Sequence, residues 1–289
     1  MTDRSVRPDV AARLAEERGF ESLFVTEHTH IPASLAEHYP GGSFPDAYTR
    51  TLDPIVALTA AAAATTTIRL GTSIMLASQH EPLVTAKALA SLDLLSQGRV
   101  ELGVGAGWLQ PELANHGVDY GRRFGHLREH VEAMRTLWRD EVAAYAGEHV
   151  RFNDVWSWPK PVQELAPSGR DGDAGGRGIP VLVGGDGARI LDRVVAYGDG
   201  WLPRAPGGLD ELAPRVRDLH GRCADVGRAP LPVTVYNVAL DPASLEAYRE
   251  LGVHRGLVRL PSGEQGEVEA ALDAAVAALD AAGFAQAAG

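Results

Sequence analysis

The stretch of this 289-residue chain that decides the fold is residues 53–104, DPIVALTAAAAATTTIRLGTSIMLASQHEPLVTAKALASLDLLSQGRVELGV. It predicts a helix that opens at Asp53-Pro54, because aspartate caps a helix and proline fits its first turn. A β-branched, apolar strand follows at residues 68–75, then a helix at residues 81–95 and a buried strand at residues 100–104. This alternation predicts parallel strands joined by helical crossovers.

The same alternation continues on both sides of this stretch. The further elements expected from the spacing of apolar residues are helices at residues 8–18, 126–138, 188–196, 210–226, 243–251 and 267–282, and strands at residues 22–26, 179–183, 200–202, 233–239 and 256–259. No linker divides the pattern, so we expect one domain over residues 1–289. Residues 168–178, rich in Gly, Asp and Arg, have little apolar surface to pack, and we expect a flexible insertion without secondary structure.

The strands expected here leave two architectures open. They number seven, which suits a doubly wound sheet, whereas a closed (β/α)8 barrel needs eight. The first expected element is a helix, with no strand before it. If the chain forms a barrel, we therefore expect that barrel to lack its first strand, which would leave two sheet edges unpaired.

Composition and charge exclude several classes of function. The net charge of -11 argues against a nucleic-acid or anionic-membrane partner, because such surfaces need clustered Lys and Arg. The single cysteine, Cys223, excludes an intrachain disulfide and a cysteine-cluster zinc site, and is typical of a reducing compartment. There is no leader-like start, and the longest apolar run, residues 55–64, is too short to span a bilayer. The sequence therefore predicts a cytoplasmic protein.

Ligands of parallel α/β folds bind at the carboxyl ends of the strands, which directs attention to the residues that follow each strand. His28 follows the first strand and is the best catalytic candidate, because imidazole shuttles protons near neutral pH. A structural hydrogen bond to a neighbouring loop is the alternative. Residues 72–75, TSIM, suit the edge and face of a flat ring, or else they fill the barrel interior.

Two glycine-rich stretches follow later strands. Residues 103–108, GVGAGW, would let the backbone approach a ligand or would form a tight turn; they are not a dinucleotide fingerprint, since no helix is expected directly after them. Residues 184–187, GGDG, favour an anion at the start of a helix, with a turn capped by Asp186 as the alternative. Trp201 would lie against a ring or in the core. No motif predicts a metal site or a hydrolytic nucleophile.

Seven short motifs occur in a characteristic order. They are residues 20–28 (FESLFVTEH), 70–73 (LGTS), 92–99 (LDLLSQGR), 103–108 (GVGAGW), 158–161 (WPKP), 183–185 (VGG) and 198–201 (GDGW). Each motif alone is weak, but together they resemble the bacterial luciferase-like monooxygenase superfamily. More closely, they resemble its branch that depends on the deazaflavin coenzyme F420.

The resemblance implies a (β/α)8 barrel that binds F420, or alternatively FMN, at its strand ends and transfers a hydride between the ring and a small organic substrate. His28 would orient the substrate or relay a proton beside the ring. The residues that the resemblance places at the cofactor are Glu27, Ser73, Ile74, Ala106, Gly107, Trp108, Gly184, Gly185 and Asp186. It also implies a cis peptide bond between Ser73 and Ile74, and a homodimer.

One departure from the family pattern bears on the substrate. Trp108 stands where the sugar-phosphate dehydrogenases of the family carry a glutamate, which speaks against sugar-phosphate oxidation. Two other functions stay open. The chain could be a reduced-FMN-dependent monooxygenase of the same fold, or a barrel that binds a cofactor or ligand without turnover.

Overall fold

A computed structural model describes residues 1–35, 44–167, 169, 175–205 and 207–284. Its central sheet contains, in spatial order, β1 (Ser22–Val25), β2 (Arg69–Thr72), β3 (Val100–Val104), β8 (Val181–Gly184) and β9 (Gly200–Leu202), all parallel. A second parallel pair, β10 (Thr234–Tyr236) and β11 (Arg255–Leu257), is joined to β9 by a bridge between Trp201 and Val233. The spatial order of the strands follows the chain, which is the order of a TIM barrel and not of a doubly wound sheet.

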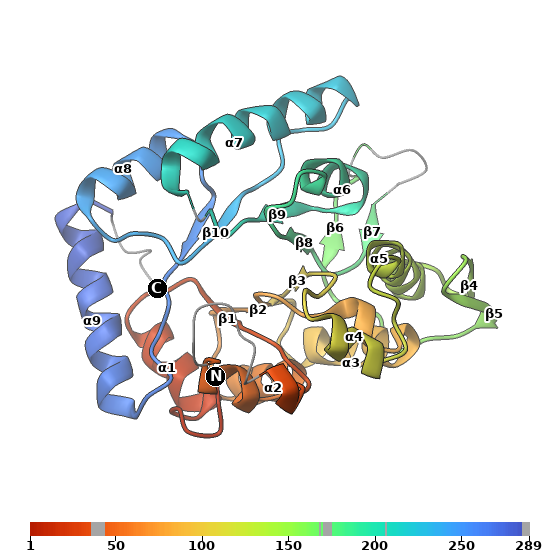
Figure 1. Cartoon of the computed structure of the whole chain (residues 1–289), viewed down its shortest axis with the longest axis horizontal. Helices are drawn as coiled ribbons and strands as arrows, with labels where there is room; N and C mark the ends of the chain where they lie inside the picture. Colours follow the sequence, from red (N-terminus) through yellow and green to blue (C-terminus); the bar gives the residue numbers. More distant parts are fainter. Residues whose placement is uncertain (36–43, 168, 170–174, 206, 285–289) are drawn as a thin grey trace.

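The helices surround these strands, as Figure 1 shows. They are α1 (Pro8–Glu17), α2 (Pro54–Ala64), α3 (Pro82–Leu95), α4 (Gln110–Asn115), α5 (Arg123–Arg139), α6 (Ile190–Tyr197), α7 (Gly208–Asp225), α8 (Pro242–Glu250) and α9 (Gln265–Ala281). The caps expected from the sequence set where several of them start: the Asp53 carboxylate accepts from the Val56 amide at 2.9 Å, ahead of the proline that opens α2. None of the described helices combines the length and apolar character of a bilayer span.

Short elements decorate the barrel. These are the 3₁₀ turns η1 (Ala33–Leu35), η2 (Asp46–Arg50) and η3 (Ala77–Gln79), and the antiparallel pairs β4 (Ala143–Ala146) with β5 (Arg151–Val155) and β6 (Glu164–Leu165) with β7 (Gly176–Arg177). Two sequence-based expectations were wrong here. A helix, α4, does open soon after residues 103–108, and β7 falls within the run expected to have no secondary structure. Positions 168 and 170–174 of that run lie outside the described residues.

The sequence predicted that a barrel formed by this chain would lack its first strand. In agreement, the described residues place no strand between β11 and β1. Each of these strands pairs on one side only, β1 with β2 and β11 with β10. A cavity of about 320 Å³ separates them, lined by side chains such as Phe24 and Leu257. At the amino-terminal end of the strands, the Arg255 guanidinium bridges the carboxylates of Glu21 and Glu101 across this cavity, at 2.6 Å from each. The charge network links the two edges without a strand between them.

Candidate active site at the carboxyl ends of the strands

His28 lies just past β1 and is held at both its backbone and its ring. The Thr51 hydroxyl accepts from the His28 amide at 3.1 Å and donates to the His28 carbonyl at 2.8 Å. The ring Nδ1 is 3.1 Å from each carboxylate oxygen of Glu112. Among the described residues, none hydrogen-bonds to Nε2, so this nitrogen is the one open to a ligand. The alternative to a catalytic role for His28 was a hydrogen bond to a neighbouring loop. Such a bond is present, but the backbone of His28 makes it and the ring does not.

Glu112 is the functional candidate that the sequence did not reveal. It lies on α4, whose first turn contains Pro111, and its side chain is fully buried. A buried carboxylate is unfavourable unless it is paired and hydrogen-bonded. His28 supplies that partner from 84 residues away in the sequence. The only signal in the sequence was a proline and an acidic residue directly after the glycine-rich stretch, which is typical of a helix start.

Two aromatic side chains border the imidazole of His28. The Tyr48 ring, on η2, has its centroid 5.3 Å from that of His28, and the two planes are tilted by 32°. The Trp108 ring stands edge-on at 6.2 Å and 83°. Both aromatic residues are unusually exposed, Tyr48 by 38% and Trp108 by 48%. The surroundings of the imidazole ring are therefore largely aromatic, which suits a substrate with apolar or aromatic character.

Glu27, next to His28 in the chain, is buried and turned to protein partners. Its carboxylate accepts from the Leu76 amide at 2.5 Å and lies 2.7 Å from Nε2 of His80. Burial alone would lower the pKa of His80, but the hydrogen bond and charge of Glu27 raise it above its ordinary value. Glu27 thus ties β1 to the segment after β2, and its contact with a cofactor stays a prediction.

An apolar platform lies at the ends of β2, β3 and β8. The cis peptide bond implied between Ser73 and Ile74 is confirmed. The Ile74 side chain occupies space that side chains on neighbouring strands would need: a Cβ on Gly105 would lie 1.9 Å from Ile74 Cδ1, and a Cβ on Gly184 would lie 2.7 Å from Cγ2. Gly107 has a φ of 81°, which supports the turn interpretation of this stretch. The glycines therefore make room for Ile74 and for the turn.

The loop after β8 is held by arginines. Both the backbone amide and Nε of Arg204 donate to the Asp186 carboxylate, at 3.0 and 2.9 Å. Arg215 donates to the Asp186 carbonyl at 2.9 Å. The alternative in which Asp186 caps α6 was wrong, because the cap position is Arg189 and no side chain caps that helix. The charge of Asp186 is thus paired, and it opposes an anion less than an unpaired carboxylate would.

Trp201 lies in the core, which was one of the two placements expected from the sequence. Its side chain is fully buried, and its indole Nε1 donates to the Gly185 carbonyl at 3.0 Å. The Arg215 guanidinium lies 5.1 Å from its ring centroid. Trp201 therefore holds the Gly185 loop by a hydrogen bond from within the core, and its buried indole does not face a ligand ring.

The predicted cofactor residues meet at one end of the strands. Half-buried or exposed members lie at the end of β2, β3 and β8 or just after it, and these strands are neighbours in the sheet: Ser73, Ile74, Gly107, Trp108, Gly184, Gly185 and Asp186. Ala106 and Glu27 are buried among them. The structure thus brings the predicted set to one end of the barrel, together with His28.

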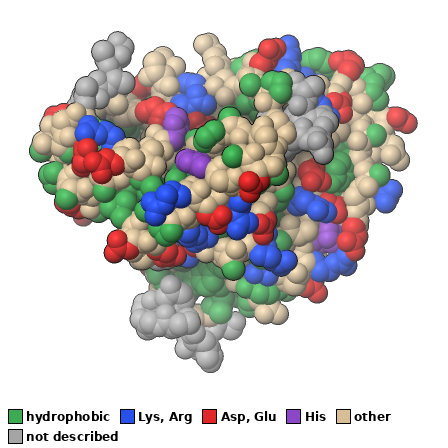
Figure 2. Space-filling model, turned by 90° about the horizontal axis from the view of Figure 1, so that it is seen from above, with side chains coloured by type: hydrophobic (Ala, Val, Ile, Leu, Met, Phe, Trp, Pro, Cys, Tyr) green, Lys and Arg blue, Asp and Glu red, His purple; other side chains and the backbone are tan. Residues whose placement is uncertain are grey.

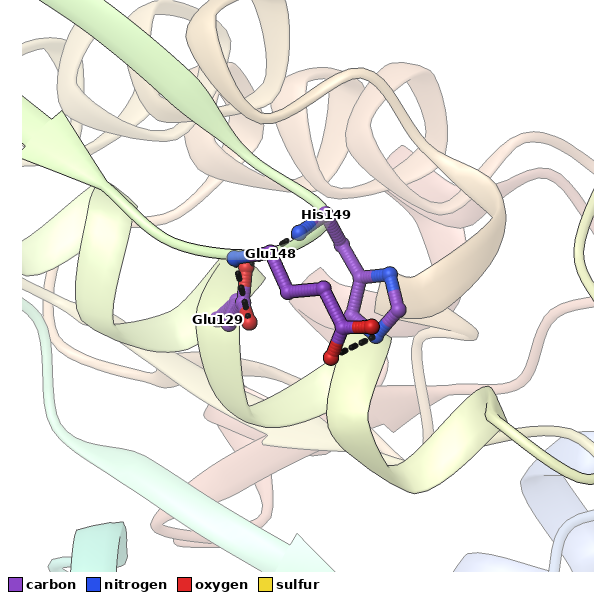
Figure 3. A group of neighbouring side chains, drawn as sticks. All are labelled: Glu129, Glu148 and His149. Atoms are coloured by element: carbon purple, nitrogen blue, oxygen red, sulfur yellow. Dashed lines mark hydrogen bonds and ion pairs between the residues drawn. The ribbon is translucent and has the colours of Figure 1, made fainter.

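A separate group of possible metal ligands lies where α5, which carries Glu129, meets the turn of the β4–β5 hairpin, which carries Glu148 and His149. Ligand atoms of Glu129, Glu148 and His149 are all within 4.8 Å of one another (Figure 3). However, the Glu129 carboxylate already accepts from the amides of Glu148, His149 and Val150 at 2.7 to 3.0 Å. Burial raises the pKa of Glu129, but these amides and nearby charges lower it below its usual range overall. We therefore interpret Glu129 as a structural residue whose carboxylate accepts hydrogen bonds from the amides of the hairpin turn.

Comparisons with known proteins agree with this fold. The family model described as luciferase-like monooxygenase matches residues 10–287. An uncharacterized protein of Mycobacterium tuberculosis is 44% identical over 266 residues, 90% of this chain and 89% of that protein. An F420-dependent glucose-6-phosphate dehydrogenase of Intrasporangium calvum is 29% identical over 263 residues, 83% of this chain and 71% of that protein.

Solved structures share the fold at lower identity. An F420-dependent secondary alcohol dehydrogenase, solved with an F420–acetone adduct, superposes with a TM-score of 0.73 at 18% identity, over 96% of each chain. This likeness supports the TIM-barrel architecture of the chain.

Proposed function

The chain belongs to the luciferase-like monooxygenase family, and from this premise we propose that it is an F420-dependent oxidoreductase acting on a small organic substrate. When bound, the deazaflavin would supply a hydride donor or acceptor. The observation that carries the proposal is the imidazole of His28, fixed by Glu112, at the strand end where the predicted cofactor residues meet. The 29% identity to an F420-dependent dehydrogenase supports the choice of cofactor.

The residues present fit a flat ring with a phosphate tail. Ile74, made possible by Gly105 and Gly184, offers an apolar platform to a ring face. The adjoining loop has an open position at Gly187, where a Cβ would meet nothing within 4 Å, and Asp186 there is charge-paired. We propose that Ser73, Ile74, Ala106, Gly107 and Trp108 hold the ring and that Gly184, Gly185 and Asp186 lie along the phosphate.

His28 would be the catalytic residue. Its Nε2 can accept a hydrogen bond from a substrate hydroxyl or donate one to a carbonyl, and can hold the proton that accompanies a hydride transfer. The half-exposed Trp108 beside it favours an apolar substrate over a sugar phosphate. The face drawn in Figure 2 shows acidic and basic side chains interspersed.

Fluorescence titration of the purified protein with oxidised F420 and, in parallel, with FMN tests the proposal. We expect saturable binding of F420 and at least tenfold weaker binding of FMN. Tight FMN binding without F420 binding would favour the FMN-dependent monooxygenase. Binding of F420 without turnover on any alcohol, aldehyde or ketone tried would favour the ligand-binding barrel.

We also propose that the protein works as a single-domain homodimer in the cytoplasm. The sole cysteine, Cys223, is buried and free, which suits a reducing compartment. Helices α2 and α3 lie side by side (Figure 1), and each exposes large apolar side chains: Val56 is 69% exposed, Val84 68% and Leu95 70%. A surface of this kind on a water-soluble fold favours contact with a second copy.

A further inference from the structure

Resting on that proposed function, we propose that Glu112 is the positioning residue of the site: its buried carboxylate holds the His28 ring by Nδ1, so that Nε2 is the nitrogen that meets the substrate. The proposal concerns groups of this chain alone. It can therefore be tested on the free protein, whether or not F420 proves to be the cofactor.

The burial and distances of the pair carry the argument. The Glu112 side chain is 0% exposed and that of His28 only 10%, so water does not satisfy the carboxylate. Both carboxylate oxygens are 3.1 Å from Nδ1, and in the described part of the chain the Glu112 carboxylate has no other hydrogen-bond partner. A carboxylate with no proton needs a donor, so the Nδ1 position carries the hydrogen.

A proton fixed on Nδ1 determines which nitrogen faces the ligand. In the neutral ring, Nε2 is left as a lone-pair acceptor, so the pairing with Glu112 selects one tautomer. Glu112 would therefore set both the direction of the ring and its tautomer.

The other titratable groups around His28 do not take this role. Tyr48 faces the ring from η2 without a hydrogen bond to it. Glu27, the neighbour in the chain, is engaged by His80 at 2.7 Å. His30 and His116 both bond the Thr29 hydroxyl, at 3.0 and 2.7 Å, on the residue after His28. Within the described residues, Glu112 is the carboxylate within hydrogen-bond distance of the ring.

NMR of the protein labelled with ¹⁵N-histidine measures the tautomer of His28 directly. The His28→Asn variant identifies its signals by difference. In the wild type we expect the Nδ1–H tautomer, and in Glu112→Gln a larger share of the Nε2–H tautomer, because the glutamine amide can donate as well as accept. The control, Glu17→Gln, removes a carboxylate that is 59% exposed on α1 and should leave the tautomer unchanged.

The wild-type spectrum alone can overturn the proposal, even if Glu112→Gln folds poorly. An Nε2–H tautomer at neutral pH would contradict it, and so would the same tautomer ratio in the wild type and in a folded Glu112→Gln. In turnover, we expect Glu112→Gln to lower kcat by 10- to 100-fold with little change in KM, and Glu112→Asp to recover part of the loss. If the NMR result holds but F420 does not bind, the proposed function fails and the positioning role stands.

Discussion

At the scale of the residue, removing His28 should affect both turnover and the stability of the buried Glu112 carboxylate. His28→Ala removes the proton carrier, so we expect turnover to fall by about 10²-fold or more while F420 affinity changes little. The same variant leaves the carboxylate of Glu112 buried and unpaired, which costs about 3–5 kcal/mol of stability. The double variant His28→Ala/Glu112→Gln should unfold at a higher temperature than His28→Ala, as measured by circular dichroism. Unchanged turnover in His28→Ala would remove His28 from the mechanism.

Gly105 offers a second test at this scale, because the Ile74 side chain fills the space of its missing Cβ. Gly105→Ala brings that Cβ within 1.9 Å of Ile74 Cδ1, so Ile74 must move. We expect a loss of about 1–3 kcal/mol in unfolding free energy, together with weaker F420 binding. Gly187→Ala, whose Cβ meets nothing within 4 Å, is the matched control and should be neutral in urea unfolding. If Gly105→Ala bound F420 as the wild type does, Ile74 would not be the platform of the ring.

At the scale of the element, the period of apolar residues predicted the long helices and the buried strands well. The expected strand at residues 100–104 coincides with β3 (Val100–Val104), and all five of its residues are buried. Helix α4 was missed because its six residues are too few to show a helical period. Since Glu112 lies on α4, the partner of His28 was missed with it: a contact across 84 residues leaves no local pattern in the sequence.

Glu16 shows how a single carboxylate can join elements. It accepts hydrogen bonds from the amides of Thr66, Thr67 and Ile68 at 2.6 to 2.9 Å, which ties the end of α1 to the turn before β2. Burial raises the pKa of Glu16, but these amides outweigh it and lower the pKa to about 2. Because the pKa is lower in the folded state than its ordinary value of 4.5, the stabilisation is present above about pH 4.5 and is lost as the pH falls toward 2.

Urea unfolding of the wild type and of Glu16→Gln across pH 3 to 7 measures this effect. We expect the wild type to be more stable at pH 7 and the difference to shrink as the pH falls, since the protonated carboxyl resembles the amide. Glu17→Gln, on the same helix but in a different, exposed ion pair, should show no such dependence. A constant difference between wild type and Glu16→Gln at every pH would show that shape, not charge, matters at this position.

At the scale of the whole molecule, the strand order distinguished the two architectures that the sequence had left open. Seven expected strands were compatible with either, because the number of strands does not encode their spatial order. The pairing of β3 with β8 across a long insertion, and the bridge from Trp201 to Val233, make the order sequential. The family motifs had indicated the barrel, and three of them, residues 70–73, 103–108 and 183–185, lie at the carboxyl ends of the neighbouring strands β2, β3 and β8.

The outer surface of α2 and α3 leads to the last prediction. A helix that is apolar all round, such as α2 (Pro54–Ala64), is normally covered on every side. Val56 on α2 and Leu95 on α3 are instead exposed by 69% and 70%. We expect light scattering to give about twice the chain mass of 30.7 kDa, and Leu95→Glu to give the monomer, because a charge in an apolar interface is left unpaired. Val226→Glu places the same charge at the end of α7, away from α2 and α3 (Figure 1), and should leave the dimer intact. A monomeric wild type, or dissociation by Val226→Glu alone, would assign this surface to another role.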